Sequence, residues 1–403
     1  MRVAVIGAGT AGPAAALGLA RLGASVTLVE RAPSPSPVGA GILLQPTGRA
    51  VLAGLGLEAE VVSRGCPIHR LHGVTPRGRA VLDLRYADLQ AALYGVGIQR
   101  GSLFAALYEA LAPAGVRVET GVEVSDLTED STGRLALVTG SGLDALRFDL
   151  VIVADGARSR LRARVASVRR ARPYPFGALW FVAEDRDGVF DGVLFQTYRG
   201  PREMLGLLPS GRGPGDPRNL CSVFFSLAMD QVEAVRREGL PRFRDRAIAL
   251  CPPAAPLLEQ IPALDALLVA AYHDVVMPRP WRSTSAGATA VVLGDAAHAM
   301  SPQLGQGANL ALLDAAELVE SVARHGCVAE PARLPLAVAE AVTRGLRRVR
   351  TYQFLSRWLT PVFQSRWPLV GPLRDAFFGP LGRVPFFRRL MLEALCGALP
   401  RRR

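Results

Sequence analysis

The pattern of apolar and polar residues near the N-terminus predicts a strand, a helix and a second strand. Residues 3–6 form a short apolar run that stops at Gly7, which is typical of a strand buried on both faces of a parallel sheet. A helical pattern continues to Arg21, and residues 25–29 then predict the second strand, which is followed by Glu30. Together these elements predict one βαβ unit.

The sequence pattern, and with it the predicted secondary structure, changes twice along the rest of the chain. Residues 39–65 and 102–111 predict helices, and short apolar runs predict further strands at 116–119, 135–138, 148–153 and 290–293. Between about residues 173 and 229, aromatic and β-branched residues occur in short runs broken by Gly and Pro, which is the composition of an antiparallel sheet. The last 80 residues have helical periodicity and are punctuated by proline.

This order predicts an α/β protein in which a Rossmann-type dinucleotide-binding domain is interrupted by an antiparallel β-sheet domain that binds substrate. The expected dinucleotide-binding domain is discontinuous and comprises residues 1–65, 99–165 and 281–325. The expected substrate domain comprises residues 66–98 and 166–280. Residues 326–403 form the expected helical C-terminal region.

Composition excludes several kinds of chemistry. The 403 residues include 47 basic residues, all of which are arginine, so mechanisms that need a lysine amine are excluded. The formal charge of +12 comes without a basic block interleaved with aromatic residues, and we therefore expect no nucleic-acid partner.

Cysteine and histidine spacing argues against a metal site. The five cysteines form no C-x-x-C pair, and the five histidines form no H-E-x-x-H pair. Scattered, unpaired cysteines are typical of buried thiols in a reducing compartment, so we expect a cytoplasmic protein. The uncharged stretch from residue 3 to 20 is not interpreted as a signal peptide, because its three central glycines have the spacing of a nucleotide-binding turn.

That turn is the first chemical motif. Gly7, Gly9 and Gly12 follow the first strand and open the helix, and Glu30 stands 18 residues beyond Gly12, at the end of the second strand. In this motif the first glycine permits the tight turn, the second lets a pyrophosphate approach the backbone, and the third lets the helix pack on the strand. Glu30 can accept hydrogen bonds from both hydroxyls of a ribose. The alternative is an ordinary βαβ turn.

Two further motifs establish a family resemblance. Residues 149–162, with Asp155-Gly156 at their centre, resemble the DG motif of the FAD-dependent aromatic hydroxylases, the group A flavoprotein monooxygenases. Residues 292–298, with Gly294-Asp295, resemble the GD motif of the same family, and the likeness continues through Pro302 and residues 305–309. The resemblance covers about three quarters of the chain, and it implies that the dinucleotide is FAD.

The resemblance also implies roles for individual residues. Asp295 would hold a ribityl hydroxyl of the flavin, and the N–H groups near Gly307 and Ala308 would face the N1 and O2 edge of its ring. Pro302 would lie along the ring, and Pro302, Gly305 and Gly307 are the candidate catalytic residues. The expected cofactor-binding residues are Gly7, Gly9, Ala11, Gly12, Glu30, Arg31, Arg100, Val124, Asp155, Gly156, Gly294, Asp295, Gly307, Ala308 and Asn309.

The same resemblance makes Asp155 a backbone-organising residue at the cofactor. Arg158 and Arg160 are candidate contacts for the phosphates of a nicotinamide cofactor, with solvated helix-start residues as the alternative. His298 is expected to pack and hydrogen bond beside the cofactor rather than to take part in catalysis.

The substrate pocket is expected between the β-sheet domain and the flavin. From composition alone we name His72, Phe195, Tyr198 and Phe225, together with Trp180, as candidate substrate contacts. The alternative for each aromatic residue is a place in the hydrophobic core.

The function implied by the resemblance is an FAD-dependent monooxygenase. NADH or NADPH would reduce the flavin, O2 would add at C4a, and the resulting hydroperoxide would hydroxylate a small aromatic or quinone-like substrate. A halogenase is disfavoured because the chain has no lysine. A reductase of the same fold and a non-catalytic or maturation-type flavoprotein that acts on a partner remain as alternatives.

The C-terminus carries one further expectation. Residues 386–392 and the terminal Arg401, Arg402 and Arg403 are amphipathic and basic, which predicts weak peripheral contact with an anionic membrane. The alternative is a helix packed on the core, followed by a solvated tail.

Overall fold

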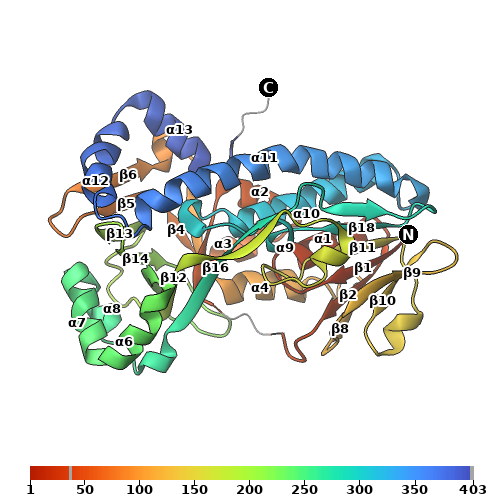
Figure 1. Cartoon of the computed structure of the whole chain (residues 1–403), viewed down its shortest axis with the longest axis horizontal. Coiled ribbons are helices and arrows are strands. Elements are labelled where there is room, and N and C mark those ends of the chain that lie inside the picture. Colours follow the sequence, from red (N-terminus) through yellow and green to blue (C-terminus); the bar gives the residue numbers. More distant parts are fainter. Residues whose placement is uncertain (36–38, 400–403) are drawn as a thin grey trace.

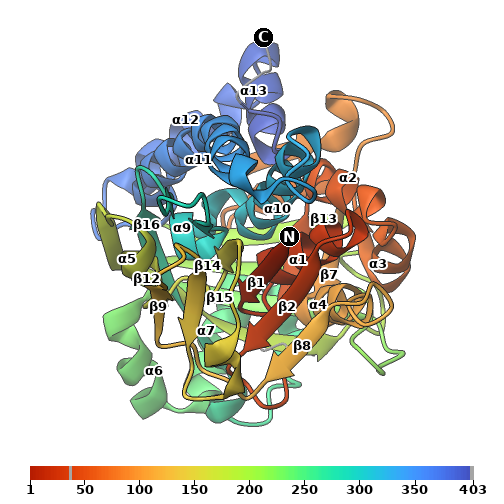
Figure 2. The same ribbon diagram turned by 90° about the vertical axis from the view of Figure 1, so that its right-hand side faces the viewer.

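The computed structural model describes residues 1–35 and 39–399. Its first sheet contains six strands, which are parallel except for the pairing of β17 with β18. In spatial order the strands are β17 (Trp281–Ser283), β18 (Thr289–Val292), β11 (Leu150–Val153), β1 (Arg2–Ile6), β2 (Ser25–Glu30) and β8 (Arg117–Thr120). The predicted βαβ unit is therefore confirmed as the centre of a Rossmann-type sheet (Figure 2).

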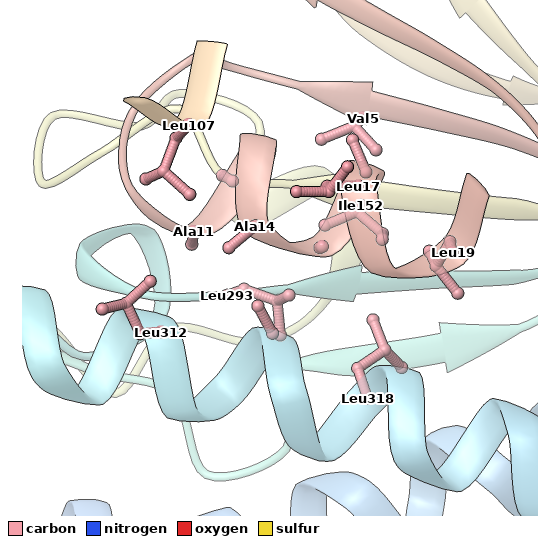
Figure 3. Packing of buried hydrophobic residues seen from close by; sticks show 14 of the residues in the cluster. Val5, Ala11, Ala14, Leu17, Leu19, Leu107, Ile152, Leu293, Leu312 and Leu318 are labelled. Carbon is pink, nitrogen blue, oxygen red and sulfur yellow. The ribbon is translucent and has the colours of Figure 1, made fainter. Parts of the chain in front are cut away.

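Both faces of this sheet are covered, which explains the unbroken apolar run in β1. Val3 and Val5 enter a cluster on the face covered by α1 (Ala11–Arg21), α4 (Arg100–Glu109) and α10 (Gly307–Arg324). Ala4 and Ile6 enter a separate cluster on the other face. Figure 3 shows the first cluster, in which side chains of α1 lie against those of α10.

The second face of the sheet is covered by smaller elements. They are the hairpin of β9 (Asp126–Glu129) and β10 (Leu135–Val138) and the short helices α5 (Arg162–Val165) and α9 (Asp295–His298).

A second, seven-stranded sheet is mostly antiparallel, as expected for the inserted segment. Its spatial order is β16 (Leu268–Val276), β12 (Arg170–Glu184), β15 (Leu220–Ala228), β14 (Glu203–Pro209), β13 (Val193–Arg199), β5 (Arg70–Val74) and β6 (Ala80–Arg85). One face packs on the helices α6 (Val232–Glu238), α7 (Leu240–Leu250) and α8 (Ala255–Leu258), which lie together below the sheet in Figure 1. The α/β fold class with an antiparallel sheet is confirmed.

The prediction of a helix over residues 39–65 is wrong in its first part. The chain forms the strand β3 (Gly41–Leu44) and then the helices α2 (Pro46–Gly54) and α3 (Glu58–Arg64), whereas residues 36–38, just before this stretch, lie outside the described part. Pro46 occupies the first turn of α2, where a missing backbone N–H costs nothing. The strand forms because its backbone pairs with β7 (Gly95–Gln99), which also pairs with β4 (Cys66–Ile68).

This small three-stranded sheet connects the two larger ones. The backbone N–H of Gln99 at the end of β7 donates to the carbonyl oxygen of Ser210, directly after β14, at 3.0 Å. The Gln99 amide also donates to the Ser210 hydroxyl at 2.6 Å. The chain between the two sheets is therefore fixed by buried polar contacts.

The C-terminal region is helical, as its periodicity predicts. The 30-residue helix α11 (Leu334–Phe363) runs along the top of the molecule in Figure 1, and α12 (Val370–Leu381) and α13 (Pro385–Leu395) gather at one end of it. Arg401, Arg402 and Arg403 lie outside the described residues. Within the described part of the chain, no helix is both long enough and apolar enough to cross a membrane.

Candidate flavin and substrate site

A large cavity lies between the six-stranded sheet and the seven-stranded sheet. Its volume is about 1480 Å³, which exceeds the ~300–1,000 Å³ of an ordinary small-molecule site. Its lining changes character from one end to the other. The turn after β1, the ends of β2 and β11 and the start of α10 form a polar half, and the large sheet with α11–α13 forms an apolar half.

The glycine turn after β1 has the close contacts that its motif requires. Gly7 has φ +104°, and a Cβ there would lie 2.5 Å from the carbonyl oxygen of Ala154. A Cβ at Gly12 would lie 2.0 Å from the oxygen of Gly7, so α1 packs directly against the turn. A Cβ at Gly9 would meet nothing within 4 Å, and Gly9 lines the cavity. The turn therefore leaves open space where a pyrophosphate can approach the backbone.

Glu30 is held at the edge of this turn by two backbone donors. The N–H of Ala8 donates to its Oε2 at 2.8 Å, and the N–H of Ala32 donates to its Oε1 at 3.0 Å. These hydrogen bonds fix the carboxylate against the glycine turn, each of its oxygens can still accept a further hydrogen bond, and the residue lines the cavity. The arrangement suits a carboxylate that accepts hydrogen bonds from a ribose.

The DG motif supplies a buried polar atom with no partner. Oδ1 of Asp155 is buried and has no hydrogen-bond partner among the described residues, although the side chain lines the cavity. Burial raises the pKa of Asp155, despite hydrogen bonds with its surroundings. Arg162 stabilises the turn at Asp155-Gly156, because its Nη2 donates to the carbonyl oxygen of Gly156 at 3.1 Å. Sequence reasoning gave Arg162 no role, although it belongs to the same motif.

The GD motif and the turn that follows it form the floor of the polar half. Asp295 is the first residue of α9, and α10 begins at Gly307, close to the Asp295 carboxylate. Asp295, Gly307 and Ala308 all line the cavity. Pro302 and Gly305, in the turn between the two helices, line it as well. The N-terminus of the 18-residue helix α10 thus faces the cavity.

Asn309 has a different position from the one expected. Its side chain is fully buried and does not line the cavity. Its Oδ1 accepts from the backbone N–H of Gln45 at 2.8 Å, and its Nδ2 donates to the carbonyl oxygen of Leu43 at 3.2 Å. Asn309 therefore fixes β3 to α10, because its amide satisfies backbone groups that β3 leaves unpaired at its end.

His298 pairs with a buried carboxylate behind the GD motif. Its Nε2 lies 2.5 Å from Oδ2 of Asp314, which also accepts the backbone N–H of Gly294 at 3.0 Å. Burial lowers the pKa of His298, but the charge and hydrogen bond of Asp314 outweigh burial and raise it above its ordinary value. His298 does not line the cavity, so its position agrees with the expected packing role.

Most of the residues expected to bind the cofactor do line the cavity. In addition to those described, Ala11, Arg31, Arg100, Val124 and Gly156 belong to its lining, as do Arg158 and Arg160. Gly12 and Gly294 do not line it. Gly12 lies against the backbone of Gly7, and the backbone N–H of Gly294 donates to Asp314.

Three of the four predicted substrate residues lie on the face of the large sheet that is turned away from the cavity. Phe225 is 1% exposed and packs edge-on against Phe243 of α7 at a ring distance of 5.4 Å. Phe195 and His72 lie on that same face, with their rings 5.8 Å apart. Tyr198 does line the cavity, as does Trp180. Side chains alternate between the two faces of a strand, and composition does not tell which face is covered by helices.

The cavity-facing residues of the large sheet are therefore partly different from those predicted. Phe224, the neighbour of Phe225, lines the cavity with its ring 4.8 Å from that of Trp180. Gln196, Ser226 and Tyr272 add the polar groups of this half. The alternation along β13 and β15 shows which residues share a face of the sheet. It does not show which face is covered, because the helices α6, α7 and α8 between β15 and β16 were not predicted.

Comparison with known proteins decides the family. The model of the FAD binding domain family matches residues 1–231 and 258–349. The chain belongs to this FAD-binding family. The match spans both sheets, and it confirms the predicted resemblance to the FAD-dependent aromatic hydroxylases.

Members of this family with curated functions resemble the chain over most of its length. The aurachin C monooxygenase/isomerase of Stigmatella aurantiaca is 28% identical over 349 residues, which cover 84% of this chain and 83% of that protein. The 6-methylpretetramide 4-monooxygenase of Streptomyces rimosus is 30% identical over 344 residues, which cover 82% of this chain and 76% of that protein.

A solved structure shares the fold. Klebsiella pneumoniae HpxO, complexed with FAD and uric acid, superposes with a TM-score of 0.79 at 20% identity, covering 98% of this chain and 97% of that one.

The residues of this FAD-binding chain fit the group that its family binds. Gly9 leaves open space beside the backbone, Glu30 carries a carboxylate held by two backbone donors, and Asp155 has an unpartnered buried oxygen. These three residues and the N-terminus of α10 all line the same cavity. Space for a pyrophosphate, acceptors for hydroxyl groups and a helix N-terminus are what a dinucleotide needs, so the donor set fits FAD.

Proposed function

We propose that this protein is an FAD-dependent monooxygenase that uses NADH or NADPH and O2 to hydroxylate a small aromatic or quinone-like molecule. The observation that carries the proposal is the single cavity whose polar half fits FAD and whose other half is apolar and aromatic. The monooxygenase activities of the similar curated proteins support it.

The flavin supplies the difficult chemistry in this proposal. When bound, FAD would couple oxidation of NAD(P)H to reduction of O2, so that one oxygen atom enters the substrate and the other leaves as water. The protein binds the ring, orients the substrate and keeps water away from the reaction.

Several of its own residues would act at the ring. The N–H groups at Gly307 and Ala308 would face negative charge that develops on the reduced ring, and a helix N-terminus stabilises such charge by roughly 0.3–1 kcal/mol, or ~2 when it is partly buried. Asp295 would hold the ribityl chain, and Pro302 would lie against the ring. Arg158 and Arg160, at the rim of the polar half, would contact the phosphates of NAD(P)H.

The apolar half would hold an aromatic ring between side chains and orient it with few polar groups. Trp180 and Phe224 present adjacent rings, and the Tyr198 hydroxyl donates to Oε1 of Gln196 at 2.7 Å. Burial raises the pKa of Tyr272 to about 12, so its hydroxyl is a neutral donor at physiological pH. Polar groups of this kind suit a substrate hydroxyl or carbonyl.

Substrate-dependent consumption of NAD(P)H tests the proposal. The purified protein should carry one non-covalent FAD, and acid precipitation should release it. Phenols, indoles and quinone precursors are then screened for stimulation of NAD(P)H oxidation, and labelled O2 should place one labelled atom in the product. Reduction of the added molecule would instead indicate a reductase, and oxygen in the product that comes from water would indicate an oxidase. No turnover with any of them would favour a partner-type flavoprotein.

The compartment in this proposal is the cytoplasm. All five cysteines are free thiols, and four of them are buried. Thiols of this kind suit a reducing environment.

A further inference from the structure

Large apolar side chains are exposed on the three C-terminal helices. Trp358 is 70% exposed and Trp367 75% exposed, values typical of charged surface residues rather than of tryptophan. The exposed apolar residues of this region are Phe354, Trp358, Trp367, Leu369, Leu373, Phe377, Val384, Phe386, Phe387 and Leu390. We call this set the C-terminal apolar surface.

The spacing of these residues places them on single faces of the helices. Phe354 and Trp358 are four residues apart on α11, and Leu369, Leu373 and Phe377 follow the same interval at α12. In Figure 1 α12 and α13 lie together at one end of α11, and Figure 2 shows the three helices on the same side of the molecule. The apolar surface is thus a patterned feature of neighbouring helices rather than a set of scattered side chains.

The opposite face of α12 is firmly attached to the large sheet. The Arg374 side chain is fully buried, and its guanidinium lies 4.8 Å from the centre of the Tyr198 ring. Its Nη1 donates to the carbonyl oxygen of Gly200 at 3.0 Å. These contacts hold α12 on the sheet with its apolar face toward solvent. The exposed apolar residues therefore do not belong to a helix that has separated from the core.

Positive charge surrounds this surface. Residues 341–399 contain ten arginines and only two carboxylates, Asp375 and Glu393. Arg347 and Arg350 precede Phe354 at intervals that place all three on one face of α11, and both arginines are exposed. Seven of the ten arginines pair with carboxylates, but within residues 1–35 and 39–399 Arg347 and Arg350 form no ion pair, so their charge is uncompensated. A complementary partner must combine an apolar interior with negative charge at its surface.

The cavity opens within this same surface. Phe354 and Trp358 of α11 and Leu390 of α13 line the cavity, although each of them is more than 40% exposed. A side chain that both lines the cavity and meets solvent stands at its mouth. A molecule that enters here passes between exposed apolar side chains before it reaches the apolar half.

We propose that the C-terminal apolar surface docks on an anionic lipid bilayer, and that the cavity there receives an aromatic substrate bearing a hydrocarbon chain from the lipid. Exposed Trp and Phe enter the interfacial region of a bilayer, while the arginines contact lipid phosphates. The docking does not depend on the proposed function. The substrate part does, because it rests on the proposed monooxygenase activity. Contact is peripheral, since the described helices include none that could cross the membrane.

Vesicle binding tests the docking directly. The FAD-loaded protein should sediment with vesicles of phosphatidylcholine and phosphatidylglycerol, and binding should weaken on vesicles of phosphatidylcholine alone or at high salt. The Leu373→Glu/Phe377→Glu and Arg347→Glu/Arg350→Glu variants should each bind at least about tenfold more weakly, because charge enters the bilayer in one and reverses at its surface in the other. Leu336→Glu is the matched control: Leu336 is 65% exposed near the other end of α11, and this variant should bind normally.

A fluorescence measurement reports which residues enter the lipid. Brominated lipids quench tryptophans that lie in a bilayer, so they should quench the wild-type protein. They should quench the Trp358→Phe/Trp367→Phe variant much less, because Trp180 and Trp281 remain away from the lipid. Equal binding to neutral and anionic vesicles, or no quenching, overturns the proposal. So does a stable dimer that the Leu373→Glu/Phe377→Glu variant disrupts, because a second copy of the chain would then cover the surface.

The substrate part is tested by comparing phenol with 4-octylphenol. We expect 4-octylphenol to perturb the absorption of the bound flavin at a much lower concentration than phenol does, and anionic vesicles loaded with it should support its binding. Equal affinity for the two phenols overturns the substrate part. If vesicles bind the protein but no compound stimulates NAD(P)H oxidation, the proposed function fails while the docking stands.

Discussion

Removal of the Glu30 carboxylate should weaken FAD binding without unfolding the protein. The carboxylate is held by the N–H groups of Ala8 and Ala32 at 2.8 and 3.0 Å, and Glu30 lines the polar half of the cavity. In the Glu30→Ala variant the ribose loses its acceptor, and the two N–H groups lose theirs. In the Glu30→Gln variant one neutral oxygen still accepts, whereas the NH2 group cannot accept from the second backbone N–H, so only part of the acceptor set remains.

The magnitude follows from the hydrogen bonds. A hydrogen bond to a charged group contributes about 1.5–3 kcal/mol, and a difference of about 1.4 kcal/mol is a tenfold change in the dissociation constant. Loss of one or both ribose bonds should therefore raise the dissociation constant for FAD at least about tenfold in Glu30→Ala. We expect a smaller increase in Glu30→Gln. Titration of the apoprotein with FAD, followed by quenching of flavin fluorescence, measures both values.

Glu119→Ala is the matched control for this experiment. Glu119 lies on β8, the strand next to β2, and its carboxylate pairs with Arg117 at 2.6 Å instead of lining the cavity. Its FAD affinity should equal that of the wild type. An unchanged dissociation constant in Glu30→Ala would refute the placement of the ribose at Glu30. An equal loss in both variants would indicate general damage to the sheet.

Three further predictions concern stability and packing. Phe225→Ala should lower the free energy of unfolding by about 3–5 kcal/mol in denaturant titration, whereas Phe224→Ala should cost clearly less and alter substrate binding. Gly12→Ala puts a Cβ 2.0 Å from a backbone oxygen and should destabilise the apoprotein by about 1–3 kcal/mol in thermal melts, whereas Gly9→Ala should leave its melting temperature unchanged and weaken FAD binding. Burial lowers the pKa of His298, but its carboxylate partner outweighs burial and raises it. The difference in melting temperature between wild type and His298→Gln should therefore be fully present below pH about 6.5, and should shrink as the pH rises through the raised pKa; a pH-independent difference would contradict this.

The polar half of the site could be predicted because local sequence determines it. The contacts that define the turn after β1 are between backbone atoms, and only glycine fits at Gly7 and Gly12, so the motif is visible in the residue types themselves. The strand β1 was visible for a similar reason, since both of its faces are buried and its residues are uniformly apolar. Asn309 shows the limit of this reasoning. It belongs to the predicted motif, but its side chain points to the backbone of Leu43 and Gln45 and does not line the cavity. The residue type alone does not reveal this orientation.

The apolar half could not be predicted in the same way, because its composition is shared by both faces of the sheet. Phe224 and Phe225 are chemically identical, and only the packing of α7 on one face places Phe225 in the core and Phe224 in the cavity. β3 was missed for a related reason. Its apolar residues Ile42, Leu43 and Leu44 suit a helix as well as a strand, and its pairing partner lies more than 50 residues away.

The division of the cavity has a consequence for specificity. The proposed FAD contacts come from the ends of β1, β2 and β11 and from the start of α10, whereas the proposed substrate half is lined by the large sheet and by α11–α13. Substitutions at Trp180, Phe224 or Gln196 can therefore change the substrate while the backbone that binds FAD stays in place. One fold can in this way carry many aromatic oxygenations, since the cofactor fixes the reaction and the alternating residues of the large sheet fix the molecule that is presented to it.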